Sequence, residues 1–414
     1  MNSLQAWWRA FERRTRDRRF VLRCLIGIFV LALVLRAILA WFHPMLLPDS
    51  FDYLTLAHRI IAGQSYQVTG MYAKRMPGYP VFLAAIGYPD GIDIRAVLMV
   101  QALFGALVSV VVFALGRPWG AATGLLAALL VACDPLCIGF SAAVLTEIPF
   151  MLVFIISLLL LAQLVERPGS LWRWVLFAVS FAIGVYVRAE VSLCLFPLLI
   201  WVVYRNRNGQ ALWHAIGGSL LAMGLVMLIL LPWWLRNNRL FHQDFFRFTT
   251  LQGISLYESV YKGATGGPRQ SDIVRPPAIQ KLNESQRDLA WTHRAVLDMY
   301  HHPFRMLRLA FLKVGRTWSP WLHARGYARP WINISFCFWY VPLFFLALAG
   351  LPMARKRVGL TGVMLIPILY FTIMHAVFLG SVRYRVPVMP LVCIFAAAAP
   401  AYWIEKIGCK GKPA

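Results

Sequence analysis

The sequence predicts an all-helical polytopic membrane protein, a bundle of about ten transmembrane helices. Of its 414 residues, 60% are hydrophobic and only 14% are charged. Soluble domains carry roughly 25% charged residues, so the composition favours a membrane protein. Apolar runs of the length that crosses a bilayer as a helix also recur from one end of the chain to the other.

Ten apolar runs are the expected transmembrane helices. The run at 121–136 is short, and only the kink Arg188-Ala189-Glu190 separates the fifth run from the sixth. An even number of spans places both ends of the chain on the same side of the membrane. The expected spans lie near residues 24–42, 94–115, 121–136, 148–165, 174–190, 191–204, 212–234, 331–351, 359–379 and 386–404.

The basic residues indicate which side that is. Seven arginines precede Cys24, and further Lys and Arg residues stand in the short connections on the same side, as the positive-inside rule requires of cytoplasmic segments. The termini are therefore expected in the cytoplasm, with the protein in the cytoplasmic (inner) membrane of the cell. The net charge of +24 follows from these topology signals and from contact with anionic headgroups, so no nucleic-acid partner is predicted.

The parity divides the chain into five parts. Residues 1–23 form a cytoplasmic basic tail, 24–235 an N-terminal transmembrane bundle with a first outer loop at 43–93, 236–330 a periplasmic or interfacial segment, 331–404 the C-terminal transmembrane helices, and 405–414 a cytoplasmic tail.

Two stretches on the outer side have helical periodicity with a polar stripe. One runs from Phe51 to Ile61 and ends at Gly63, and the other covers 303–318. This pattern favours helices that lie in the membrane interface.

Ionisable and polar residues gather at the outer ends of the predicted spans. Such groups are costly at membrane depth and mark functional sites. On one face of a bundle they would form a polar cavity. The candidate catalytic residues are Asp49 and Glu147, and the candidate substrate- or phosphate-binding residues are Asp52, Tyr53, Lys74, Arg75, Arg188, Arg236, Arg383, Tyr384 and Arg385.

These residue types suit chemistry on a phosphate-linked lipid. Arginine matches phosphate oxygens two at a time, and a carboxylate can remove a proton from an incoming hydroxyl. The departing phosphate is a stabilised anion, so the reaction has no strict need of a general acid. The sequence contains no G-x-x-x-x-G-K-[ST] phosphate loop and no H-E-x-x-H or C-x-x-C spacing.

Several of these pieces, in this order, resemble the GT-C class of membrane glycosyltransferases. The resemblance is specifically to bacterial relatives of the dolichyl-phosphate-mannose–protein mannosyltransferases and of the lipid A aminoarabinose transferases. Together the pieces span residues 24–404. They are PDSFDYLTLAHRIIAG, KRMPGYPVFLAAI, LTEIPF, PWWLRNNRLFHQDFFRFTTLQGISLYESV and RYRVPVMP.

The resemblance implies a fold, an activity and roles for three residues. It implies transfer of a sugar from a polyprenyl-phosphate donor to a hydroxyl of a glycolipid, polysaccharide or protein on the periplasmic side. Asp49 matches the catalytic base, Glu147 a second acid that binds or orients substrate, and Arg75 a lysine that binds the lipid phosphate. Met76-Pro77-Gly78 departs from the family's proline pair, and Asp49-Ser50 from its two adjacent acids. A divalent metal therefore stays open.

Other readings of the same residues remain. Asp49 is also a suitable cap for the interfacial helix, Glu147 a structural partner for Arg36 or Arg188, and Lys74 and Arg75 suitable contacts for lipid headgroups. The alternative function is a transporter or flippase of an anionic lipid or lipid-linked sugar. Such proteins usually contain inverted repeats and broken helices near the midplane.

Overall fold

The computed structural model describes residues 2–242, 248–323 and 329–409, and within them the chain is almost entirely helical, without a strand. Parts of the expected segments 236–330 and 405–414 lie outside the described residues. The α-helices are α1 (Asn2–Arg14), α2 (Arg18–Phe42), α3 (Pro48–Ile61), α4 (Gly78–Gly87), α5 (Ile94–Gly116), α6 (Ala121–Ala132), α7 (Pro135–Ser141), α8 (Glu147–Glu166), α9 (Leu171–Val187), α10 (Leu195–Arg205), α11 (Gln210–Phe241), α12 (Gln252–Val260), α13 (Pro277–Gln280), α14 (Glu284–His301), α15 (Pro303–Thr317), α16 (Pro330–Gly350), α17 (Val358–Val377) and α18 (Met389–Cys409). Short 3₁₀ helices are η1 (Arg117–Trp119), η2 (Ala189–Cys194), η3 (Gln270–Asp272), η4 (Leu351–Arg357) and η5 (Val382–Val388).

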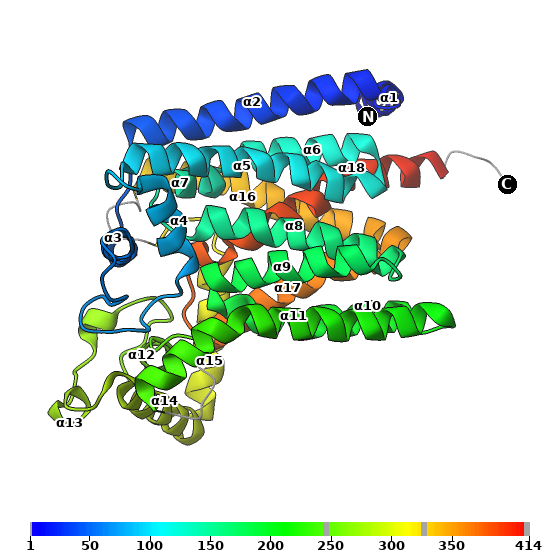
Figure 1. Ribbon diagram of the computed structural model, residues 1–414. Coiled ribbons are helices and arrows are strands. Elements are labelled where there is room, and N and C mark those ends of the chain that lie inside the picture. Colours follow the sequence, from blue (N-terminus) through cyan, green and yellow to red (C-terminus); the bar gives the residue numbers. More distant parts are fainter. Residues whose placement is uncertain (1, 243–247, 324–328, 410–414) are drawn as a thin grey trace.

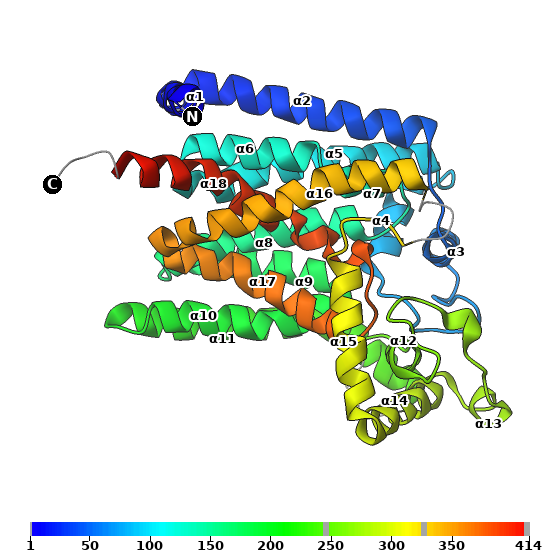
Figure 2. The same ribbon diagram turned by 180° about the vertical axis from the view of Figure 1, so that it is seen from behind.

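The long apolar helices run side by side in one bundle (Figures 1 and 2). Helices α3, α4 and α12–α14 gather at one end, which we call the loop end, while α1 and the last turns of α18 lie at the other end. Both ends of the described chain are therefore on the same side of the bundle, as the even number of expected spans predicts.

The expected spans differ in length among the described residues. Seven helices among the described residues are long and apolar enough to cross a membrane, and the pair α6–α7, bent by 52°, makes an eighth if it is one span. Helices α9 and α10, expected as two spans, have only 17 and 11 residues and are separated by η2 at the predicted kink. The chain is nevertheless a multi-pass membrane protein, as predicted.

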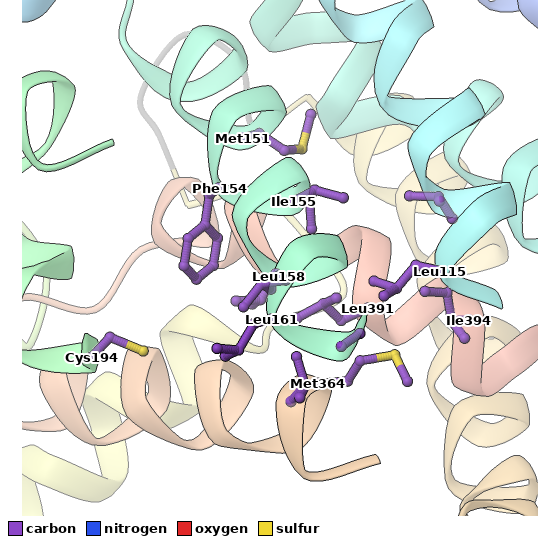
Figure 3. Packing of buried hydrophobic residues seen from close by; sticks show 14 of the residues in the cluster. Leu115, Met151, Phe154, Ile155, Leu158, Leu161, Cys194, Met364, Leu391 and Ile394 are labelled. Atoms are coloured by element: carbon purple, nitrogen blue, oxygen red, sulfur yellow. The ribbon is translucent and has the colours of Figure 1, made fainter. Parts of the chain in front are cut away.

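Helix α8 lies at the centre of the bundle and is mostly buried by its neighbours. Its apolar residues cover its whole circumference, which is typical of a helix surrounded by others. Phe154, Ile155 and Leu158 are at most 1% exposed and pack toward side chains of α5, α17 and α18, among them Leu115 and Met364 (Figure 3). This packing holds the first turn of α8, at the loop end, in a defined place.

The two expected interfacial helices are α3 and α15. In α3 the Ser50 hydroxyl accepts a hydrogen bond from the Leu47 amide, and Gly63, with φ of +63°, follows the helix end. Both helices lie across the direction of the bundle, α3 seen end-on in Figure 1 and α15 crossing in Figure 2. Large apolar side chains of α15, such as Phe304 and Phe311, are exposed, as expected for contact with lipid.

Arg36 does not pair with Glu147, one of the partners considered for it. Its guanidinium is buried and donates to the carbonyl oxygens of Ala32, Val131 and Ala132 at 2.8–3.0 Å. Two of these carbonyls end α6, where the chain bends into α7. The arginine thus donates to carbonyls that have lost the i+4 amide donors of a continuous helix, because Pro135 has no amide hydrogen and the Leu136 amide donates to the Tyr340 hydroxyl.

Close packing of α16 on α18 depends on Gly350. A Cβ atom at this position would overlap the carbonyl oxygen of Phe395, whereas a Cβ at Gly217 of α11 meets nothing within 4 Å. We expect Gly350→Ala to lower the free energy of unfolding by about 1–3 kcal/mol. Gly217→Ala should leave it unchanged or raise it, because alanine favours helix. Thermal unfolding in detergent tests this, and equal stability of the two variants would contradict it.

Candidate active site

A polar cavity of about 260 Å³ opens at the loop end of the bundle. Its walls come from seven separate parts of the chain, including α3, α12, α17 and η5. The lining residues are Asp49, Tyr53, Lys74, Arg75, Met76, Thr146, Val187, Arg188, Ala189, Glu190, Thr249, Leu251, Gln252, Ser255, Met374, His375, Phe378, Leu379, Arg383 and Tyr384.

Four carboxylates and four cations form one continuous series of ion pairs beside this cavity, which we call the ion-pair chain. Its formal charges cancel. The order of contacts is Lys74, Asp52, Arg75, Asp49, Arg383, Glu147, Arg188 and Glu190.

The first half of the ion-pair chain joins α3 to the loop that follows it. Lys74 Nζ lies 2.8 Å from Asp52 Oδ1, and Arg75 Nη2 lies 2.9 Å from Asp52 Oδ2. The same nitrogen is 2.6 Å from Asp49 Oδ1. The Arg75 guanidinium also lies over the ring of Tyr53, 5.2 Å from its centroid. Asp49 and Asp52 stand three residues apart in α3, so both carboxylates face the same arginine.

The second half joins α3 to the core of the bundle. Arg383 Nη1 lies 2.7 Å from Asp49 Oδ2, and its Nε donates to Glu147 Oε1. Arg188 Nη1 contacts the same Glu147 oxygen at 3.0 Å, and its Nη2 lies 2.8 Å from Glu190. Glu147 is fully buried in the first turn of α8, where the helix dipole stabilises a negative charge.

Asp49 is held as an anion with both oxygens engaged. Burial raises the pKa of this carboxyl, but the guanidiniums of Arg75 and Arg383 outweigh burial and lower the pKa to about 2. The residue does not cap α3, whose N-cap is Leu47. Asp49 can accept a proton near neutral pH only after one of the guanidiniums has moved away.

A buried carboxylate from another part of the chain positions the Lys74–Arg75 pair. Glu284 accepts hydrogen bonds from the backbone amides of Tyr72 at 2.6 Å and Ala73 at 2.9 Å, and from the hydroxyl of Thr250. It therefore anchors the residues that directly precede Lys74. Nothing in the sequence around Glu284 indicates this role, because the backbone amides that it binds are more than 200 positions away.

Two predicted site residues lie away from the cavity. Arg236 donates to the carbonyl oxygens of Tyr66 and Tyr72 at 3.1 and 3.0 Å. It therefore holds the loop that leads to Lys74 without lining the cavity. Arg385 donates to carbonyl oxygens of Thr317 and Ser319 instead of facing the cavity.

The backbone of η5 explains the position of Arg385. A 3₁₀ helix has about three residues per turn, so a residue two positions after Arg383 points to a different side. The guanidinium of Arg385 lies 4.5 Å from the ring centroid of Tyr340, which compensates for burial of its charge.

The cavity and the ion-pair chain bring together the other predicted residues from distant parts of the sequence. These are Asp49, Asp52, Tyr53, Lys74, Arg75, Glu147, Arg188, Arg383 and Tyr384.

The cavity also contains uncharged polar residues that the sequence analysis missed, among them Gln252, Ser255 and His375. His375 lies within an apolar run, and the other two lie in a piece that carries the family resemblance but gives neither of them a role. No local signal singles them out.

The arrangement of the acids does not fit a divalent cation. The Arg383 guanidinium bridges Asp49 and Glu147, the two acids that would be its natural ligands. Among the described residues, no group of three or more His, Cys, Asp or Glu side chains converges as a metal site would require.

Comparisons with known proteins agree with this architecture. Residues 76–235 match the sequence model of the dolichyl-phosphate-mannose-protein mannosyltransferase family. The fold is similar to that of the archaeal oligosaccharyltransferase AglB from Archaeoglobus fulgidus, solved in complex with an inhibitory peptide and a dolichol-phosphate, with 13% identity and a TM-score of 0.59. This match covers 95% of the chain and 52% of AglB, so the chain spans about half the length of that protein.

ArnT from Cupriavidus metallidurans, solved bound to undecaprenyl phosphate, has 16% identity and a TM-score of 0.45 over 93% of this chain and 78% of ArnT. A search of curated proteins found no match. The fold is therefore similar to that of AglB, and the family match of residues 76–235 agrees with the sequence resemblance to the GT-C class.

The bridging role of Arg383 leads to a stability prediction. Arg383→Gln leaves the ion-pair chain with one excess negative charge, and breaking a buried pair in this way typically costs about 3–5 kcal/mol. The double variant Arg383→Gln/Asp49→Asn restores neutrality, so we expect it to recover part of the lost stability. Thermal unfolding of both variants in detergent at neutral pH tests this. A double variant less stable than the single one would contradict the prediction.

The lowered pKa of Asp49 leads to a second prediction. Because the folded pKa of about 2 lies below the ordinary 3.8, the ionised carboxylate stabilises the fold above about pH 4, and this stability is lost as the pH falls through about 2. The melting temperature of the wild type should therefore fall more steeply over this range than that of Asp49→Asn. Parallel curves for the two proteins would show that Asp49 does not contribute.

Proposed function

We propose that this protein transfers a sugar from a polyprenyl-phosphate donor to a hydroxyl of a glycolipid, a polysaccharide or a protein. The observation that carries the proposal is the ion-pair chain along a cavity at the loop end of a GT-C fold. The match to a family named for a dolichyl-phosphate-mannose donor supports the choice of donor. The proposed location is the cytoplasmic membrane, with both termini in the cytoplasm and the cavity facing the periplasm.

The guanidiniums of Arg75 and Arg383 are the proposed phosphate ligands. Each already binds carboxylate oxygens beside the cavity, and a phosphate presents similar oxygens with more charge. When either guanidinium turns to the donor phosphate, Asp49 loses a cation that lowers its pKa. Donor binding thus makes Asp49 a better base.

The reaction follows from this rearrangement. Asp49 takes the proton of the acceptor hydroxyl, and the hydroxyl oxygen bonds to the anomeric carbon of the sugar. The bond between that carbon and the phosphate oxygen breaks, and polyprenyl phosphate leaves as an anion held by the arginines. Glu147 orients the sugar or acceptor indirectly, because its own contacts fix Arg383 and Arg188.

The transporter or flippase alternative gains no support from the comparisons. It would use the same charges without forming a bond, so an assay for bond cleavage separates the two functions.

The test is release of free polyprenyl phosphate when purified protein is mixed with a membrane extract of its source. Asp49→Asn should slow release by about 10²–10⁴-fold, the usual contribution of a positioned base. The matched control is Asp93→Asn in the same loop, an exposed helix N-cap that asparagine replaces well. Equal release by all three proteins would remove Asp49 as the base. Absence of release by the wild type, with an extract that contains the donor, would favour the transporter.

A further inference from the structure

His375 has an unused polar atom at the wall of the cavity. The residue belongs to α17 and is only 3% exposed. Its Nε2 atom is buried and has no hydrogen-bond partner, although the side chain lines the cavity. Most buried side-chain polar atoms are paired, so one without a partner in an enzyme cavity requires an explanation.

The other contacts of the ring define what Nε2 can do. Nδ1 lies 3.1 Å from the carbonyl oxygen of Leu379. A carbonyl oxygen only accepts hydrogen bonds, so Nδ1 carries the hydrogen, and Nε2 of the neutral ring is an acceptor with a free lone pair.

Aromatic stacking fixes the direction of that lone pair. The ring of His375 is stacked on Tyr384, with centroids 4.2 Å apart and planes 7° apart, and the ring of Phe371 lies 6.2 Å away at 26°. Rotating the imidazole out of its plane would break the stacking, and flipping it within its plane would break the bond to Leu379. The acceptor atom is therefore held in place before any ligand enters.

A hydroxyl group is the ligand that matches this atom. The cations along the cavity are engaged by carboxylates, whereas an acceptor on a neutral ring suits a neutral donor such as O–H. Gln252 and Ser255 line the same cavity and add uncharged hydrogen-bonding groups. A sugar presents several hydroxyls, and so do most acceptors of a sugar.

We propose that His375 is a substrate-binding residue whose Nε2 accepts a hydrogen bond from a hydroxyl of the sugar donor or of the acceptor. The inference rests on the proposed transfer reaction. It adds a selectivity element, because a substrate without a hydroxyl at this position would leave Nε2 buried and unpaired.

Kinetics of three variants provide the first test. His375→Phe keeps an aromatic ring for the stack and removes the acceptor, so KM for one substrate should rise about tenfold, the value of one hydrogen bond. His375→Gln keeps an acceptor and should lose less. His58→Phe is the matched control, since His58 makes a similar Nδ1 contact, 2.8 Å from the Leu54 carbonyl, on an exposed face of α3. Equal kinetics of His375→Phe and His58→Phe would overturn the proposal.

A binding measurement separates this inference from the proposed function. In ¹⁵N-histidine-labelled protein, the Nε2 signal of His375 is identified by its loss in His375→Gln. We expect this signal to shift when the polyprenyl-phosphate-sugar fraction of the source membranes is added, or when the extract depleted of that fraction is added. The first result assigns the hydroxyl to the donor and the second to the acceptor.

The combined outcomes decide both ideas. A shift without sugar transfer would remove the proposed function and keep His375 as a binding residue for hydroxyls. Transfer by the wild type without a shift in either mixture would overturn the role of His375. Neither transfer nor a shift would overturn both.

Discussion

The contact of Arg383 with both Asp49 and Glu147 is the interaction on which the loop end of this protein depends. Asp49 belongs to α3, which lies across the direction of the bundle, and Glu147 belongs to α8 at the centre of the bundle. Arg383 itself stands in η5, directly before the last helix of the bundle. One guanidinium thus joins three parts of the fold that are far apart in the sequence. Without it, Asp49 and Glu147 would share no cation, and the ion-pair chain would carry one excess negative charge.

Charge balance explains how such a site can exist at the end of an apolar bundle. Each acid of the ion-pair chain has at least one cation within hydrogen-bond distance, and the eight formal charges cancel. Burying a charge without a partner is far more costly than burying a pair. The balance also bears on the proposed donor. An anion enters favourably only where guanidiniums can exchange a carboxylate for it, and a phosphate presents the oxygens to do so.

Sequence reasoning found most of this site because charged residues are conspicuous at the ends of apolar runs. Asp49, Glu147 and Arg383 all stand at such ends, and the structure brings them together. Arg385 has the same signal, but the direction of its side chain depends on the local turn of the backbone, which composition does not reveal. His375 has no signal, since a histidine in an apolar run is equally compatible with the core. Helices α9 and α10, at the expected spans 174–190 and 191–204, have only 17 and 11 residues because the chain breaks at η2, where the sequence predicted a kink.

The same contacts that stabilise this site also restrain its chemistry. With both oxygens of Asp49 bound to arginines and its pKa near 2, the carboxylate cannot activate water or an acceptor while no donor is present. Under the proposed reaction, the donor phosphate is the ligand that draws a guanidinium away. Binding energy from the phosphate is thereby used to expose the base only when an activated sugar is in place. Glu284 anchors the backbone just before Arg75. A fixed backbone allows the Arg75 guanidinium to leave Asp49 for the phosphate and to return to the same position afterwards.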